Sequence, residues 1–407
     1  MIRRSAALSG LVLAAGLLAG GRSPAGQPPP PPPPAQADDL NDVVHASNTS
    51  TANVKIVSDN WDGITVRIQG NNTLSFPVDT ITGVEYAQRP REYDEAASAR
   101  NAGRYADAAG LLEKGLKGLK ADTLPQRQYF LVGIIECCEA LMASQPDQQS
   151  QTREKLRAAA KEMIALKPEP RLIYDAYLKL ANSYFQEGGP DSFKTAEDTY
   201  KAALKLFTEM GGRKEISGKR GVERFIERYG LVARLGTIRC AEALGRIDGA
   251  GGARPEYEVF PARAAGHTDL IGQAKLGYGR CLAARNPDEG ISYFKDLLGK
   301  VPAAAVPDVY CALGDAYLVK AESPKKDELD YYWARWYYLK VVVQYSAARD
   351  TLARAHFGAG KCYEALGAAV RESGAAAKAV REFETVVKDF PDSPEYALAK
   401  GRLGERR

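Results

Sequence analysis

The stretch that decides the fold is Tyr310-Cys311-Ala312-Leu313-Gly314-Asp315-Ala316-Tyr317. Its Tyr, Leu, Gly and Tyr stand at positions i, i+3, i+4 and i+7, a spacing that puts all four on one face of an α-helix. The pattern returns in His356-Phe357-Gly358-Ala359-Gly360-Lys361-Cys362-Tyr363. Gly314 and Gly360 fall at the same place in the two copies, where a small residue lets a second helix approach closely. The stretch therefore predicts pairs of closely packed helices that recur along the chain.

Each copy is followed by a second helical pattern. Ala334 and Tyr338 lie four residues apart after the first copy, and Ala379 and Phe383 do so after the second, before Pro391. Residues i and i+4 share a helix face, and proline ends a helix. Weaker copies begin at Tyr177-x-x-Leu180-Ala181-x-x-Tyr184 and Lys275-x-x-Tyr278-Gly279-x-x-Leu282, and a degenerate one turns at Gly103-Arg104-Tyr105.

These residues resemble the tetratricopeptide repeat. The resemblance implies a solenoid of stacked helical hairpins, since one hairpin cannot bury its apolar face alone. It also implies a non-enzymatic protein whose partners are other proteins. The run from Val387 to Ala397 is similar to tetratricopeptide proteins of the bacterial envelope, which implies a scaffold there.

The composition changes along the chain and predicts six segments. The fold class we expect is mainly α, a helical-hairpin solenoid preceded by a small all-β, barrel-like module. The predicted segments are a signal peptide or anchor at 1–25, a proline-rich linker at 26–39, the β module at 40–88, N-terminal helical repeats at 93–246, a Gly/Pro-rich link at 247–266, and C-terminal repeats with a capping helix at 267–407.

The N-terminus has the pattern of an export signal. Arg3 and Arg4 precede an apolar, uncharged run from Ser5 to Gly21, with small residues following. We expect cleavage and a periplasmic or envelope location; the alternative is an uncleaved segment that anchors the chain in the membrane. The seven prolines of Pro28–Pro34 favour a polyproline II spacer of about 20 Å.

Residues 40–88 follow a strand pattern instead. Val54 and Ile56 alternate with polar residues, as do Ile64, Val66 and Ile68, and turn-forming Asn, Asp and Gly separate the runs. The order of the runs resembles SH3-like or Sm-like small barrels, which implies a docking module. Trp61 lies in a predicted turn, where it either contacts a partner or, the favoured alternative, covers its own barrel.

The sequence gives no catalytic, cofactor or metal pattern. Three scattered histidines and six cysteines without a C-x-x-C pair do not match a metal site. The cysteines fit small buried hydrophobic positions, with disulfides as the alternative in an exported chain. The formal net charge of +4 gives no nucleic-acid footprint. We therefore expect no enzyme activity, no cofactor, no small-molecule substrate and no nucleic acid partner.

The candidate protein-binding residues come from two sources. In the tetratricopeptide family the first helix of each hairpin lines a groove, and the matching positions here are Asp175, Asn182, Phe185, Arg280, Asp315, Arg354 and Lys361. Their mixed charges disfavour a clamp for a terminal carboxylate, and a merely solvated inner face is the alternative. The second source is Tyr331-Tyr332-Trp333-Ala334-Arg335-Trp336-Tyr337-Tyr338. Ala334 and Tyr338 belong to the core pattern, so Trp333, Trp336 and Tyr337 either contact a partner or cover the preceding loop.

The sequence thus predicts an exported scaffold or adaptor that binds proteins through its solenoid. The alternative from another class is a structural envelope component, tethered to a membrane or the wall by the N-terminal segment, with no discrete peptide ligand. A cell-wall enzyme is a third and weaker alternative.

Overall fold

The computed structural model describes residues 41–47, 49–69, 72–119, 124–145, 148–323, 327–369, 371–391 and 393–404. The predicted leader and proline-rich linker lie outside these residues. Among the helices that are described, none is both long enough and apolar enough to cross a membrane.

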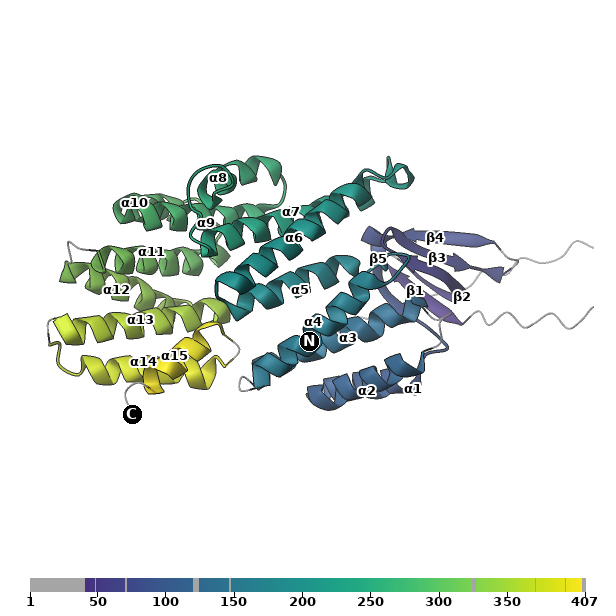
Figure 1. Ribbon diagram of the computed structural model, residues 1–407, viewed down its shortest axis with the longest axis horizontal. Helices are drawn as coiled ribbons and strands as arrows, with labels where there is room; N and C mark the ends of the chain where they lie inside the picture. Colours follow the sequence, from purple (N-terminus) through teal and green to yellow (C-terminus); the bar gives the residue numbers. More distant parts are fainter. Residues whose placement is uncertain are drawn as a thin grey trace, which may run out of the picture. The chain divides into compact units, whose positions relative to one another are not determined.

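A small β-sheet is followed by a long array of helices (Figure 1). Within the described residues there are fifteen α-helices: α1 Arg91–Asn101, α2 Tyr105–Gly118, α3 Leu124–Ser144, α4 Gln149–Ala165, α5 Ile173–Glu187, α6 Pro190–Gly211, α7 Arg220–Ala243, α8 Ala253–Arg263, α9 Thr268–Arg285, α10 Pro287–Leu298, α11 Val306–Ala321, α12 Glu328–Gln344, α13 Arg349–Ala369, α14 Ala375–Asp389 and α15 Glu395–Gly404. The predicted fold class, a mainly helical repeat array after a small β module, is confirmed.

The helices pair in sequence order. Each odd-numbered helix from α1 to α13 packs on the even-numbered helix that follows it, and each hairpin then packs on the next. The helix α15 packs mainly on α14, where Ala399 joins the core of Phe383 and Val386. Stacked hairpins of this kind bury one continuous core, because each hairpin covers the apolar face of its neighbour.

Glycines fix the spacing between the helices, as the repeated Gly positions predicted. The ring of Tyr338 on α12 lies between Gly314 of α11 and Gly358 of α13, and a Cβ at either glycine would come within 2.7 Å or 2.4 Å of that ring. In the last hairpin, Gly360 meets Phe383 in the same way. Real Cβ atoms do not approach a ring this closely, so only glycine permits this packing.

Helix α8 lies inside the stretch 247–266, which the Gly/Pro content predicted to be a link. The stretch begins as a loop and then forms a helix whose Tyr257 and Phe260 are fully buried. These two rings join one core cluster with residues of α7 and α9, such as Leu235 and Ala274. The burial of two aromatic side chains outweighs the low helix propensity of the surrounding glycines and prolines.

The β module is a five-stranded antiparallel sheet with the strand order β4-β3-β2-β1-β5. The strands are β1 Asp42–Ala46, β2 Thr49–Asn60, β3 Gly63–Arg67, β4 Thr73–Pro77 and β5 Ile81–Glu85, with a 3-10 turn at Val78–Thr80 between the last two. The long strand β2 pairs with β1 through its first half and with β3 through its second half. The predicted alternation is visible in the core, which contains Val54, Ile56, Ile64 and Val66.

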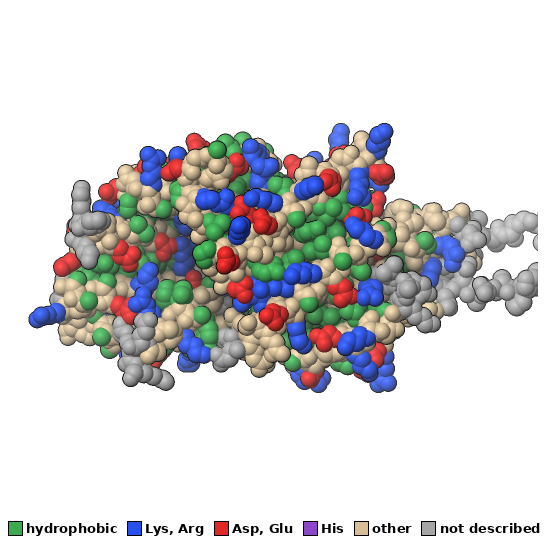
Figure 2. Space-filling view, in the orientation of Figure 1, with side chains coloured by type: hydrophobic (Ala, Val, Ile, Leu, Met, Phe, Trp, Pro, Cys, Tyr) green, Lys and Arg blue, Asp and Glu red, His purple; other side chains and the backbone are tan. Residues whose placement is uncertain are grey.

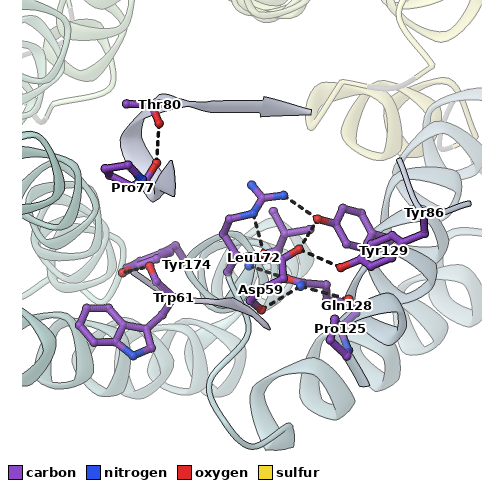
Figure 3. Close-up of polar contacts among 11 residues, drawn as sticks. Asp59, Trp61, Pro77, Thr80, Tyr86, Pro125, Gln128, Tyr129, Leu172 and Tyr174 are labelled. Atoms are coloured by element: carbon purple, nitrogen blue, oxygen red, sulfur yellow. Dashed lines mark hydrogen bonds and ion pairs between the residues drawn. The ribbon is translucent and has the colours of Figure 1, made fainter. Parts of the chain in front are cut away.

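The sheet docks on the helices through a buried polar cluster (Figure 3). The carboxylate of Asp59 at the end of β2 is fully buried and pairs with Arg171 at 3.0 Å. It also accepts hydrogen bonds from the hydroxyls of Tyr86 and Tyr129, which point toward it in Figure 3. Burial raises the pKa of Asp59, and Arg171 and the hydroxyls oppose that effect. Gln128 extends the cluster by donating to the backbone oxygen of Asp59.

Trp61 corrects the sequence prediction, which favoured a ring covering its own barrel. The ring is buried in the helical core that contains Ile173 and Tyr174, and the Arg213 guanidinium lies 4.8 Å from its centre. The Tyr174 hydroxyl donates to the Trp61 backbone oxygen at 3.0 Å. The sequence could not show this docking because the partners of Trp61 lie more than a hundred residues further along the chain.

All six cysteines are buried free thiols: Cys137, Cys138, Cys240, Cys281, Cys311 and Cys362. The prediction that they act as small hydrophobic residues agrees with these positions. Burial raises the pKa of Cys240 and Cys362 to about 12. Thiols with such pKa values are poor nucleophiles at neutral pH, since little thiolate forms.

Candidate protein-binding surfaces

The predicted groove residues on α5 are engaged within the array. Asp175 accepts a hydrogen bond from the Tyr229 hydroxyl of α7 at 2.9 Å, and burial raises its pKa. Asn182 accepts from the Tyr200 hydroxyl on α6. Phe185 packs beside Phe193, with the Arg239 guanidinium 4.7 Å from its ring. Each of these side chains joins α5 to a neighbouring helix.

Charged pairs continue this pattern in the second half of the array. Arg280 of α9 makes two bonds to the Glu242 carboxylate of α7, at 2.6 and 3.0 Å, and Glu242 also accepts from Tyr257. Burial disfavours the charge on Arg280, but the bonds to Glu242 outweigh it and raise its pKa. Charge-assisted pairs of this bidentate kind fix geometry as well as adding stability.

Asp315 and Arg354 form the next such connection. Asp315 of α11 accepts from Arg354 of α13 and from the Tyr338 hydroxyl of α12. The Asp315 carboxylate raises the pKa of Arg354, against the effect of burial. The sequence treated these residues as independent groove positions, whereas the structure brings Asp315 and Arg354 together. We call the contacts Asp175–Tyr229, Glu242–Arg280 and Asp315–Arg354 the inter-hairpin ladder.

Lys361 stands apart from the ladder. Its ammonium group lies 6.0 Å from the ring of Phe357, one turn earlier on α13. Like the other groove positions, it stays a predicted partner contact. The ladder accounts for part of the mixture of charges, because Glu242–Arg280 and Asp315–Arg354 each pair opposite charges on neighbouring odd-numbered helices.

The outer face of α12 is the most apolar exposed helix face that the described residues present. Trp333 is 43% exposed, Trp336 48% and Val343 79%, and Leu329 and Tyr332 are also exposed. These residues and Lys340 recur at spacings of three and four, so they form one stripe along the helix. The opposite face, with Ala334, Tyr338 and Val341, is fully buried. We call Leu329, Tyr332, Trp333, Trp336, Lys340 and Val343 the α12 stripe.

Tyr337 does not belong to the stripe, although the sequence grouped it with Trp333 and Trp336. It is buried and stacks between Tyr310 and Tyr317 of α11, with ring centres 6.1 and 5.5 Å away. Trp333 continues this stack on Tyr317, and Trp336 meets Tyr337 edge to face. Both tryptophans therefore pack against the buried stack of tyrosine rings, which holds them in fixed orientations.

Lysines border the aromatic stack. The Lys295 ammonium lies 5.5 Å from the Tyr317 ring, and Lys340 lies 4.3 Å from Tyr310 and 4.9 Å from Trp336. Sequence inspection missed Lys340, Leu329 and Val343, which extend the stripe in both directions. Their spacings from Trp336, which are four residues for Lys340 and seven for Leu329 and Val343, were the available signal.

Elsewhere the surface is mixed. The face in Figure 2 carries hydrophobic patches between helices, each bordered by both positive and negative side chains. An open groove of about 390 Å³ lies between α2, α3 and α4, and the ion pairs Glu113–Lys155 and Arg127–Glu162 are part of its lining. Among the described residues, no group of three or more His, Cys, Asp or Glu side chains is arranged to hold a metal.

Comparison with known proteins supports the helical repeats. The family model of the tetratricopeptide repeat matches residues 354–393, which contain most of α13 and all of α14. No curated protein matches the chain. The hairpin α13–α14 has the glycine-on-aromatic packing of Gly360 and Phe383 that is repeated at the α11–α12 hairpin. The chain is therefore a helical-repeat protein whose residues 354–393 are similar to a tetratricopeptide repeat.

Proposed function

We propose that this protein is an exported, non-enzymatic scaffold that binds other proteins through its helical array in the cell envelope. The observation that carries the proposal is the α12 stripe. Two tryptophans, one tyrosine and two aliphatic side chains face outward from a helix whose other face is fully buried. Large exposed apolar patches on soluble proteins mark interaction sites, and Trp and Tyr are frequent anchors of protein interfaces.

The proposal is tested by capture of partners in intact cells. A photo-crosslinking residue at Lys340 should link the protein to specific envelope proteins. The Trp336→Glu variant should lose those links, because a charge replaces the central anchor. Leu398→Glu is the matched control, since Leu398 is also an exposed apolar residue but lies on α15. Equal capture of partners by the parent chain, the Trp336→Glu variant and the Leu398→Glu variant would exclude the stripe as a binding surface.

The location and the β module belong to the same proposal. Export rests on the leader pattern at 1–25. The strand order and the 3-10 turn before β5 support a small SH3-like or Sm-like barrel. We propose that this module positions the helical array, because its Asp59 and Trp61 are engaged by the helices.

A tethered structural component is the second candidate, favoured by the apolar leader and the proline run. Fractionation of a tagged chain separates the two. A tethered protein stays with membranes after a high-salt wash, and a cleaved, exported scaffold does not.

A further inference from the structure

The α12 stripe has the geometry of one half of a helix–helix interface. Leu329, Trp336 and Val343 repeat every seven residues, and Tyr332 and Trp333 fill the position between the first two. A seven-residue repeat with apolar residues at spacings of three and four is typical of helices that pack along their length on another helix. Helix α12 thus carries apolar residues on its exposed face as well as on its buried face.

The stripe is close to symmetric about Trp336. Leu329 lies seven residues before it and Val343 seven after it, while Tyr332 lies four before and Lys340 four after. When two copies of such a helix pack antiparallel around a twofold axis at Trp336, Leu329 meets Val343 of the second copy. Tyr332 then meets Lys340 of the second copy. The stripe is therefore complementary to itself, as a twofold interface requires.

We propose that a second copy of this chain covers the α12 stripe, with the two α12 helices packed antiparallel around a twofold axis at Trp336. This inference goes beyond the proposed function, because it assigns a second copy of the chain to the surface at which other proteins are proposed to bind.

The charges favour this orientation over a parallel one. The exposed acidic residues Asp327 and Glu328 lie at the N-terminal end of the stripe, and Lys340 lies toward its C-terminal end. Antiparallel packing brings Lys340 of one copy within one turn of Glu328 of the other. It also places the Lys340 ammonium near the Tyr332 ring, a cation–π contact of the kind Lys340 already makes with Trp336. Parallel packing would set like charges side by side.

The proposed interface between the two α12 helices covers only a short length of helix, and this limits the affinity of the dimer. The stripe from Leu329 to Val343 spans about 21 Å of helix, so the interface is at the small end of specific contacts. Rigid aromatic anchors lower the cost of ordering side chains on binding. We expect a dissociation constant in the micromolar range, roughly 1–50 µM.

Sedimentation equilibrium of the whole chain between 1 and 100 µM tests the association itself. The protein should pass from monomer to dimer across this range. Trp336→Glu should weaken the dimer at least about 30-fold, the effect of losing a central anchor. Val343→Glu should weaken it too, and Leu398→Glu on α15 should leave it unchanged. Trp336, Val343 and Leu398 are exposed, so all three variants are expected to keep the wild-type circular dichroism spectrum and melting temperature.

Short bismaleimide crosslinking tests the orientation. A mixture of the Leu329→Cys and Val343→Cys variants should give a crosslinked dimer, whereas Leu329→Cys alone should not, because its two thiols would lie about 21 Å apart. The six native thiols are buried and provide a low background. Efficient crosslinking of Leu329→Cys alone would overturn the antiparallel arrangement.

The outcomes separate this inference from the proposed function. A chain that stays monomeric at 100 µM, or a dimer unaffected by Trp336→Glu, overturns the self-association. If that monomer still loses crosslinks to other envelope proteins in the Trp336→Glu variant, the proposed scaffold function stands. If dimerisation occurs but no other protein is captured, the self-association stands and the scaffold function fails.

Discussion

At the scale of single residues, the close contacts between glycines and aromatic rings set how near the helices lie. Tyr338 contacts Gly314 in its own hairpin and Gly358 in the next. Gly236 with Tyr200 and Gly277 with Tyr257 repeat the arrangement earlier in the array. A helix normally loses stability at an internal glycine. At these positions the closer packing of the helices offsets that loss.

The pair Gly358→Ala and Gly272→Ala separates these two effects. In Gly358→Ala the new methyl group meets the Tyr338 ring, so we expect a net loss of about 1–2 kcal/mol in the free energy of unfolding. In Gly272→Ala, on α9, nothing lies within 4 Å of the new methyl group, and improved helix propensity should add about 0.5–1 kcal/mol. Urea unfolding followed by circular dichroism measures both. Equal effects in the two variants would contradict the role assigned to Gly358.

The sequence predicted this level of the structure best. The Tyr/Leu/Gly/Tyr spacing identified Gly314 and Gly360 as points of close approach, since the pattern depends only on neighbours within one hairpin. The partners of Asp175 and Arg280 were not predictable in this way. Asp175 of α5 binds Tyr229 of α7, and Arg280 of α9 binds Glu242 of α7. No local spacing in the sequence connects these partners.

At the scale of helices and sheets, the inter-hairpin ladder ties successive odd-numbered helices together. The Asp315–Arg354 contact joins α11 to α13, and both side chains are about one third exposed. Exposed ion pairs contribute little because water screens them. This contact is supported by Tyr338, whose hydroxyl also donates to Asp315.

A double-mutant cycle of Asp315→Asn and Arg354→Met measures the coupling. We expect about 0.5–1 kcal/mol, the upper end for pairs that solvent reaches. The same cycle on Lys205 and Glu209, a long and well exposed pair on α6, is the control and should give close to zero. If the coupling free energy between Asp315 and Arg354 is no larger than that of the control pair, the ladder provides hydrogen-bond partners for polar groups but adds no stability.

The docking of the β module depends more strongly on one carboxylate, that of the buried Asp59. Asp59→Ala leaves the Arg171 charge buried without its partner and removes an acceptor from two tyrosine hydroxyls. We expect a loss of about 3–5 kcal/mol in the free energy of unfolding. Asp198→Asn on the exposed side of α6 should change it by no more than about 0.5 kcal/mol. If Asp59→Ala lowers the free energy of unfolding by no more than Asp198→Asn does, the module docks through Trp61 alone.

Helix α8 is an element that local composition did not predict. The glycines and prolines of 247–266 predicted a link between two parts of the array, and in the structure this stretch is a loop up to Gly252 and then helix α8. The helix after it exists because Tyr257 and Phe260 have a core to enter, which α7 and α9 supply. That core is a tertiary feature, so composition alone could not reveal it.

At the scale of the whole molecule, the buried thiols report on the integrity of the array. The six cysteines are distributed over five odd-numbered helices, from α3 to α13, and all are buried. Burial raises the pKa of Cys138, Cys240, Cys281 and Cys362 to about 12, so at pH 8 these side chains stay protonated in the folded protein.

Thiol titration with a chromogenic disulfide at pH 8 should therefore find almost no reactive cysteine in the folded chain and six in urea. The sign follows from the pKa values: the unfolded thiols ionise near pH 9 and react as thiolate, whereas the folded thiols retain their protons. Raising the pH above 9 should favour unfolding for the same reason. Rapid reaction of two or more thiols without denaturant would indicate that a hairpin opens readily.

The docked β module also has a consequence for the order of folding. Most helix contacts join neighbours in the chain, so each hairpin can pack on the preceding one as soon as it has been synthesised. The bonds of Asp59 and Trp61 instead close loops of more than a hundred residues, to Arg171 and Tyr174. During synthesis the module emerges first but can be locked in place only after α5 has emerged. Until then Trp61 lacks its core, which makes a newly made chain ending before α5 the form that most needs a chaperone.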